Sequence, residues 1–275
     1  MSTKPIHDKH AIYEVAFALD FGENFSAETV ADLMRLHDAV RPELPYMEER
    51  RRMSMTLSVM AGQQSTQETV VDPSPAGVVF RAVASPDPSP WMLRAENNRI
   101  IVNCLEYTRW EEIWGRTKGY LQLTLDVVAR QPSMQVNAVV LQYIDRFVRD
   151  NTDGYSAGEV FNQNSSFLTK QIFRSSELWH LHHGHFDMLE KYGKTLDVLN
   201  IGTLVDISGH TTTIDHMQQL VLQDAPLAVT DVLGKIDDIM CRLHTRNKQI
   251  LLDLLNTQML DRINLRPESA TEQCK

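Results

Sequence analysis

The chain has 275 residues, with 27 Lys and Arg against 36 Asp and Glu, which gives a formal net charge of −9. Hydrophobic residues make up 43% of the sequence, which excludes a disordered chain, and only 12 glycines exclude a collagen-like one. The acidic balance disfavours nucleic-acid binding, which normally needs a basic surface. No apolar run approaches the roughly 20 residues that span a bilayer, and the N-terminus lacks a signal-peptide pattern. We therefore expect a cytoplasmic protein without membrane contact.

The first third of the chain alternates predicted strands with turns. Residues 11–19 carry apolar side chains at every second position, which is typical of a half-buried strand. Ser26 is a favoured helix N-cap residue, and the apolar stripe after it predicts a helix that ends at Pro42. The next expected elements are a strand at 53–59, a polar loop over 61–76, a strand at 77–84 and a proline-rich loop over 85–90.

The middle of the chain contains the strongest strand pattern. Residues 134–148 are largely apolar on both faces, which is typical of a central strand with neighbours on both sides. The elements expected before it are a hairpin of strands 91–96 and 99–105 about Asn97-Asn98, and a helix over 109–130 that Thr108 caps.

The order of elements then recurs. The second half predicts a helix within 156–175, strands at about 177–189 and 195–207, a segment over 210–222 that fits either a strand or a helix, and a long helix over 228–263. We therefore expect an α+β fold. Two pseudo-repeated strand–helix–strands–helix units, 1–133 and 134–275, would form one curved antiparallel sheet with helices on one face and a long C-terminal helix. The repeat rests on element order alone, and one continuous domain is the alternative.

Several short segments resemble one protein family. They are Tyr13–Phe17, Ile101–Glu111 (IVNCLEYTRWE), Leu141–Arg146 (LQYIDR), Leu204–Ile207 and Leu243-His244. Together they are similar to a sporadically distributed prokaryotic family of proteins of similar length and unassigned function. Many members carry Leu-Arg-Tyr-Ile-Asn-Arg in the third segment, from which this chain departs at Gln142 and Asp145. The resemblance implies a mobile or defence-related gene system and brings no catalytic residues.

Four of the ten histidines lie within residues 180–185. In a strand, alternate residues share a face, and a His-x-His pair on one face can place two imidazoles on one metal ion. The candidate ligand or metal residues are His180, His182, Asp206, His210 and His216, with Asp187 and Asp215 as further carboxylates. A divalent metal site is one hypothesis. The interpretation that we favour is a polar sheet surface without a cofactor.

Asp145 and Arg146 are charged residues on the predicted central strand, where they face opposite sides. A charge inside a sheet requires a partner, so we expect structural roles, with Arg146 bonded to a carboxylate such as Glu14. Ligand binding by either residue is the alternative.

The predicted C-terminal helix carries more apolar residues than one sheet face needs to cover. In a monomer its second part would expose an apolar surface made of Leu251, Leu254, Leu255 and Met259. Exposed patches of this kind usually mark an interface. We therefore expect residues 248–260 to contact a second chain, either another copy or a partner protein. The alternative is a bent helix that folds back onto its own domain.

No nucleophile elbow, P-loop, dinucleotide fingerprint, zinc-protease helix or kinase signature is present, and the three cysteines form no Cys-x-x-Cys pair. We therefore predict no catalytic residue. The favoured function is a non-catalytic binding or assembly protein, a partner subunit or sensor in a bacterial multigene system such as a defence or toxin system. The alternatives are a His-cluster metal-dependent enzyme and a small-molecule binder that uses the cleft between the halves. Nucleic-acid binding is less favoured.

Overall fold

The computed structural model describes the backbone of residues 3–58, 66–150, 154–175, 177–206, 209–222 and 224–267, and for residues 52–58, 66–74 and 206 the backbone alone. The strands are β1 (Lys4–Pro5), β2 (Ile12–Phe21), β3 (Tyr46–Ser58), β4 (Thr66–Arg81), β5 (Trp91–Glu96), β6 (Arg99–Cys104), β7 (Gln135–Arg149), β8 (His180–Leu189), β9 (Gly193–Asp206), β10 (Gly209–Val221) and β11 (Leu227–Ala228). The α-helices are α1 (Ala27–Arg35), α2 (His37–Val40), α3 (Trp110–Val128), α4 (Val229–Leu254) and α5 (Thr257–Arg262).

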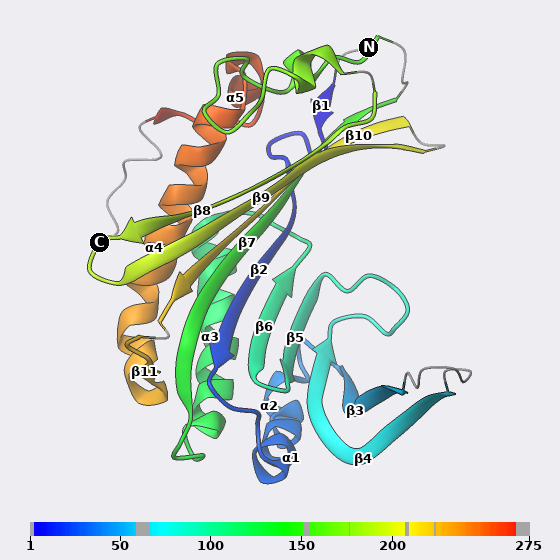
Figure 1. Cartoon of the computed structure of the whole chain (residues 1–275). Coiled ribbons are helices and arrows are strands. Elements are labelled where there is room, and N and C mark those ends of the chain that lie inside the picture. Colours follow the sequence, from blue (N-terminus) through cyan, green and yellow to red (C-terminus); the bar gives the residue numbers. More distant parts are fainter. Residues whose placement is uncertain are drawn as a thin grey trace.

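The fold is α+β, with one open antiparallel sheet of 11 strands (Figure 1). The strand order is β3-β4-β5-β6-β2-β7-β10-β9-β8, and the short strands β1 and β11 pair with the two ends of β7. The first predicted unit therefore meets the second at the β2–β7 pair, where Phe17 lies opposite Leu141. As predicted, the strand with two apolar faces lies in the middle of the sheet.

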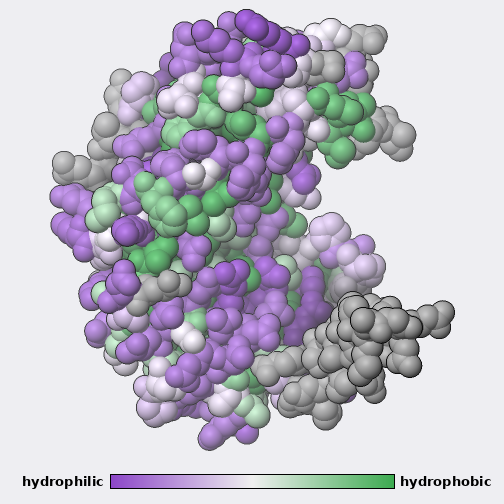
Figure 2. Space-filling model, in the orientation of Figure 1, coloured by the Kyte–Doolittle hydropathy of each residue, from purple (hydrophilic) through white to green (hydrophobic). Residues whose placement is uncertain are grey.

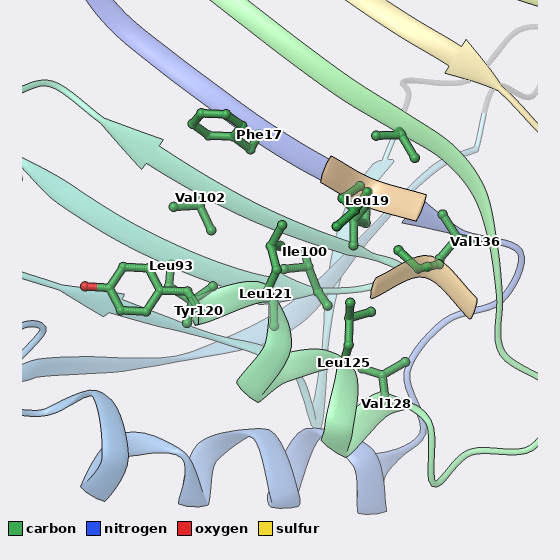
Figure 3. Close-up of a cluster of buried hydrophobic side chains, with 14 of the residues drawn as sticks. Phe17, Leu19, Leu93, Ile100, Val102, Tyr120, Leu121, Leu125, Val128 and Val136 are labelled. Carbon is green, nitrogen blue, oxygen red and sulfur yellow. The ribbon is translucent and has the colours of Figure 1, made fainter. Parts of the chain in front are cut away.

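The main apolar core lies between the sheet and helices α1, α3 and α4. Alternate residues of β2, among them Phe17 and Leu19, are fully buried and face Leu121 and Leu125 of α3 (Figure 3). Ile236 of α4 joins the same core from the second half of the chain. Each fully buried side chain of this size contributes about 2 kcal/mol through burial. Both predicted units therefore depend on a shared core.

Two local predictions are confirmed by the backbone. The Ser26 side chain accepts a hydrogen bond from the Thr29 N–H and caps α1. Asn97 has a φ of 57° in the turn between β5 and β6. This left-handed conformation suits asparagine better than most residues, which explains why Asn97-Asn98 signalled the hairpin.

Two segments differ from the sequence prediction. Residues 66–76 were expected in a polar loop, but they begin β4, which pairs with β3. Residues 156–175 were expected to contain a helix, but they form only two short 3-10 turns, at 157–159 and 172–174. In this segment Asn162 accepts from the Asn164 N–H, and such local side-chain bonds compete with a helix.

The helix predictions in the second half also need correction. The segment 210–222, which fitted either a strand or a helix, contains strand β10. The helix predicted over 228–263 ends at Leu254, because the next residue is extended and bridges to Phe161. A new helix, α5, then begins after Asn256, whose side chain accepts from the Met259 N–H. At α3 the N-cap residue is Arg109 rather than the predicted Thr108.

The apolar residues proposed as an interface are buried within the chain. The exposed fractions of Leu251, Leu254, Leu255 and Met259 are 7%, 0%, 2% and 1%. They form a second core cluster with residues of the segment 157–172 and with strands β7, β9 and β10. The prediction that a monomer exposes them is therefore wrong. The bend after α4 folds this part of the chain back onto its own domain. In the described part of the chain, no helix is both long and apolar enough to cross a membrane.

Candidate ligand-binding site

The histidines of β8 alternate between the two faces of the sheet, as predicted. His183 and His185 lie together, with ring centroids 5.3 Å apart, whereas His182 is exposed and its Nδ1 lies 2.5 Å from Asn200 Oδ1. His180 is likewise exposed, opposite Gly202 of β9. His180 and His182 therefore lie on the solvent-exposed face of β8.

The structure does not bring the candidate metal residues together. His210 is buried and stacks on Tyr155, with ring centroids 3.7 Å apart, and its Nε2 lies 3.0 Å from the Glu177 carbonyl oxygen. His216 is buried on the helix side of β10, away from the exposed His182. The side chain of Asp206 lies outside the described residues. Among the described residues, no group of three or more His, Cys, Asp or Glu is arranged to hold a metal ion.

The carboxylate partner of His216 is Asp197 of β9, a residue that no sequence pattern singled out. His216 Nε2 lies 3.1 Å from Asp197 Oδ1, and Arg246 donates to both carboxylate oxygens at 2.8–3.1 Å. The other ring nitrogen of His216 lies 2.7 Å from Asn247 Oδ1. Burial acts to raise the pKa of Asp197, but the bonds from His216 and Arg246 hold it below its ordinary value. We call these four residues the Asp197 network.

Arg146 and Asp145 lie on opposite sides of β7, as predicted, but Arg146 does not pair with Glu14. Its guanidinium carbon lies 3.5 Å from the ring centroid of Tyr13, a cation–π contact. Glu14 instead accepts a hydrogen bond from Asn103 Nδ2 at 2.6 Å. The predicted ion pair is therefore replaced by stacking on an aromatic ring.

A cavity of about 340 Å³ lies where elements of both predicted units meet, and we call it the junction pocket. Its walls come from the segment before β2, the residues that begin α3, strand β7, helix α4 and residues 263–265. The main lining residues are His10, Tyr107, Trp110, Tyr143, Asp145, His244 and Lys248. Small-molecule sites typically occupy cavities of about 300–1,000 Å³, lined by aromatic and apolar side chains with a few polar groups.

Asp145 is a buried acidic residue in the lining of this pocket. Its exposed fraction is 2%, and its Oδ2 has no hydrogen-bond partner. Among the described residues, no Lys, Arg or His forms an ion pair with it. Burial raises the pKa of Asp145 to about 7. Buried carboxyl groups are normally bonded or paired, so an unpartnered one that lines a cavity is a candidate anchor for a ligand.

His244 of α4 supplies a second incompletely bonded group. Its ring stacks on Trp110, with centroids 4.1 Å apart and planes 3° from parallel. Nδ1 lies 2.9 Å from the Tyr143 hydroxyl, whereas Nε2 is buried without a partner. Burial, and then the nearby charge of Lys248, lowers the pKa of His244 to about 3. The imidazole is therefore neutral near pH 7.

Two tyrosines complete the aromatic wall. The rings of Tyr107 and Tyr143 meet edge to face, with centroids 6.4 Å apart, and His10 packs on the other side of Tyr107 at 5.5 Å. Burial is the main cause that raises the pKa of both tyrosines above the ordinary value, so their hydroxyls stay protonated. The pocket thus combines hydroxyl groups, a neutral imidazole and a buried carboxyl.

Asp145 was predicted to lie on the central strand, but no sequence pattern connects it with His244 or Tyr107. One signal was present: Leu141, Tyr143 and Asp145 occupy alternate positions on one face of β7, so a carboxyl stands where the pattern calls for an apolar residue. The residues that line the pocket beside that carboxyl come from the segment that leads into α3 and from α4, which only the tertiary fold brings to β7.

Comparison with protein-family models and with curated protein sequences finds no match for this chain.

Proposed function

We propose that the protein binds a small molecule in the junction pocket. The observation that carries the proposal is the unpartnered carboxyl of Asp145, which lines a cavity of about 340 Å³. The unpartnered Nε2 of His244 adds a second polar contact for the same ligand. Leaving such buried groups unbonded costs about 1–3 kcal/mol each, and a ligand that bonds them recovers that energy. Binding without catalysis agrees with the absence of catalytic motifs.

The strand order of the sheet also supports this proposal. From it we infer an internal repeat of two units, with the pocket at their junction. Counted outward from the centre, the strands run β2-β6-β5-β4-β3 on one side and β7-β10-β9-β8 on the other. Apart from the two-residue strands β1 and β11, the first strand of each unit lies at the centre, beside the last strand of the same unit. A pseudo-two-fold axis between β2 and β7 would place the pocket at the junction of two curved units, where clefts for ligands commonly form. A ligand-binding sensor in a bacterial multigene system is the role that we propose.

A fragment screen followed by protein NMR tests this function. We expect fragments to shift the backbone amides of residues 107–111 and 244–248 in the wild-type protein. The variant Asp145→Leu fills the floor of the pocket with apolar atoms and should lose these shifts. Asp215→Asn is the matched control, because Asp215 lies on the neighbouring strand and accepts from Gln142 outside the pocket. Absence of any fragment that binds at the pocket would overturn the proposal.

A second candidate function is the binding of a protein partner along β8. This strand is the outer one, and no described strand pairs with its free edge. Phe186 and Met188 are 64% and 65% exposed on it. Elsewhere, in the view of Figure 2, hydrophobic residues appear in separate patches on a mostly hydrophilic surface. A partner that adds a strand to this edge would cover both side chains.

Sedimentation of the protein purified from its native host tests the second candidate. Replacing both Phe186 and Met188 by Glu should dissociate a complex that forms through β8. Met47→Glu, at an exposed apolar residue of the opposite edge strand, should leave the complex intact. A monomer in the wild-type preparation, or a complex that survives the β8 substitutions, would contradict this candidate.

A further inference from the structure

The charges around the junction pocket are unevenly distributed. At its mouth, Lys9 and Arg109 are exposed, and Arg109 forms an ion pair with Glu112. Lys248 lies beside His244, whose pKa it lowers, whereas burial alone shifts the pKa of Asp145. The positive side chains are therefore solvated, paired or directed to other neighbours. The carboxyl of Asp145 is the unsatisfied acidic group in the interior.

Aromatic side chains surround the position next to that carboxyl. Tyr107 and Tyr143 meet edge to face, and the Trp110–His244 stack lies on the α4 side of Tyr143, whose ring is 5.9 Å from that of His244. Aromatic rings attract cations through their negative faces, and the attraction grows when the cation is removed from water. A carboxylate among aromatic rings is thus complementary to a positively charged nitrogen.

We propose that the junction pocket binds a small organic amine, whose ammonium group pairs with the carboxylate of Asp145 among the rings of Tyr107 and Tyr143. This inference rests on the proposed small-molecule function and names its ligand class. The ammonium supplies the ion-pair partner that Asp145 lacks among the described residues. It also donates hydrogen bonds to acceptors that no donor in the described protein reaches. An anionic ligand would meet the carboxylate with like charge, and a neutral ligand would leave a buried carboxylate unpaired above pH 7.

Binding of an amine should depend on pH, because the ammonium pairs with the ionised form of Asp145. Three of the other titratable groups that face the pocket keep one protonation state between pH 6 and pH 8, and the exposed side chains of Lys9, Arg109 and Glu111 also belong to its lining. Burial keeps Tyr107 and Tyr143 protonated and His244 neutral, and it also lowers the pKa of His10. With the pKa of Asp145 at about 7, the ionised fraction rises about tenfold over this range. The apparent affinity follows the fraction of protein that can bind, so it should rise by the same factor.

Three probes of similar size test the inference: benzylamine as the cation, benzyl alcohol as the neutral probe and phenylacetate as the anion. Each is titrated into the full-length protein at pH 6 and pH 8, and the dissociation constant is taken from amide shifts at residues 107–111 and 244–248. We expect benzylamine to bind most tightly, and about tenfold more tightly at pH 8 than at pH 6. Asp145→Asn should weaken benzylamine binding at pH 8 and abolish the pH dependence, whereas Asp215→Asn should preserve both.

The outcomes separate this inference from the function on which it rests. Tighter binding of phenylacetate or benzyl alcohol at the same residues would overturn the amine and leave a small-molecule site. Equal benzylamine affinity in the wild-type protein and in Asp145→Asn would also overturn it. Failure of all three probes, together with failure of the fragment screen, would overturn the binding function itself. A folded Asp145→Asn protein, checked by its amide spectrum, keeps these comparisons valid.

Discussion

Two buried polar clusters lie on the helix side of the same sheet, and each combines an aspartate with a histidine next to α4. In the Asp197 network, the carboxylate accepts from Arg246 and contacts His216, which also contacts Asn247. In the junction pocket, Asp145 has an unpartnered oxygen and the His244 ring has an unpartnered nitrogen. Both clusters contain an aspartate and a histidine, but they differ in how completely these polar groups are bonded.

This difference separates a structural role from a binding role. A completely bonded buried network holds strands and helix in one arrangement, and α4 supplies two of the groups that bond Asp197 and His216. An incompletely bonded cluster destabilises the fold by itself and persists at functional sites. The comparison therefore predicts opposite effects of removing the two carboxylates.

The largest effect is expected for Asp197→Ala. This change leaves His216 without one contact and leaves Arg246 with only the exposed Asp187 as a carboxylate partner, so the free energy of unfolding should fall by about 3 kcal/mol. Urea unfolding measured by circular dichroism tests it. Asp215→Ala, on the neighbouring strand and half-buried, should cost less than about 1 kcal/mol. If Asp197→Ala lowered the free energy of unfolding as little as Asp215→Ala does, the Asp197 network would have no structural role.

Removal of the other carboxyl should stabilise the protein at high pH. The folded pKa of Asp145, about 7, lies above the ordinary value of 3.8, so the folded state holds this proton more tightly than the unfolded state. The protonated carboxyl of Asp145 therefore stabilises the folded state fully below about pH 4, and this contribution is lost as the pH rises to about 7. Asp145→Asn avoids the buried charge and should be more stable than the wild type by about 2 kcal/mol at pH 8.

The same unfolding measurement at about pH 3 supplies the control for that variant. There the carboxyl is protonated in the folded and in the unfolded state, and the two proteins should agree within about 0.5 kcal/mol. A destabilised Asp145→Asn at pH 8 would mean that the carboxylate has a partner in solution, and the contrast between the two clusters would fail.

The smallest effect is expected for Tyr143→Phe. This change removes the hydroxyl that lies 2.9 Å from His244 Nδ1, which should lower the free energy of unfolding by about 1 kcal/mol. Tyr107→Phe is the matched comparison, because the Tyr107 hydroxyl has no hydrogen bond to any described side chain, and it should be close to neutral. Thermal unfolding of the two variants measures the difference. Equal melting temperatures would show that the Tyr143–His244 bond contributes nothing to stability.

Local patterns predicted the parts of the fold that local chemistry determines. The two apolar faces of β7, the Ser26 cap and the turn at Asn97 each depend on residues close in the sequence. Residues 66–76 form a strand because β3 supplies their hydrogen-bond partners, and that pairing overrides a polar, proline-containing sequence. The end of α4 was missed for the same reason, since Leu255 pairs with a residue almost a hundred positions earlier.

The candidate site was less predictable than the fold. The histidine cluster suggested a metal site because four histidines lie close together in the sequence. Successive side chains of β8 point to opposite faces of the sheet, however, so the four histidines are divided between the two faces. Asp145 was recognisable in the sequence as a charge on an apolar strand, but His244 lies about a hundred residues away and nothing in the sequence connects the two. Their significance depends on which polar neighbours they lack, and a missing partner has no local sequence signal.

The position of β7 has a consequence for how the chain acquires its pocket during synthesis. This one strand pairs with β1 and β2 near the beginning of the chain and with β10 and β11, which are made more than sixty residues later. Contacts between such distant segments form slowly, because a long loop must close before these contacts stabilise the folding chain. The pocket floor lies on β7 and one wall on α4, so a nascent chain has no binding site until α4 has left the ribosome. A ligand can therefore stabilise the fold only after the whole of α4 has been synthesised.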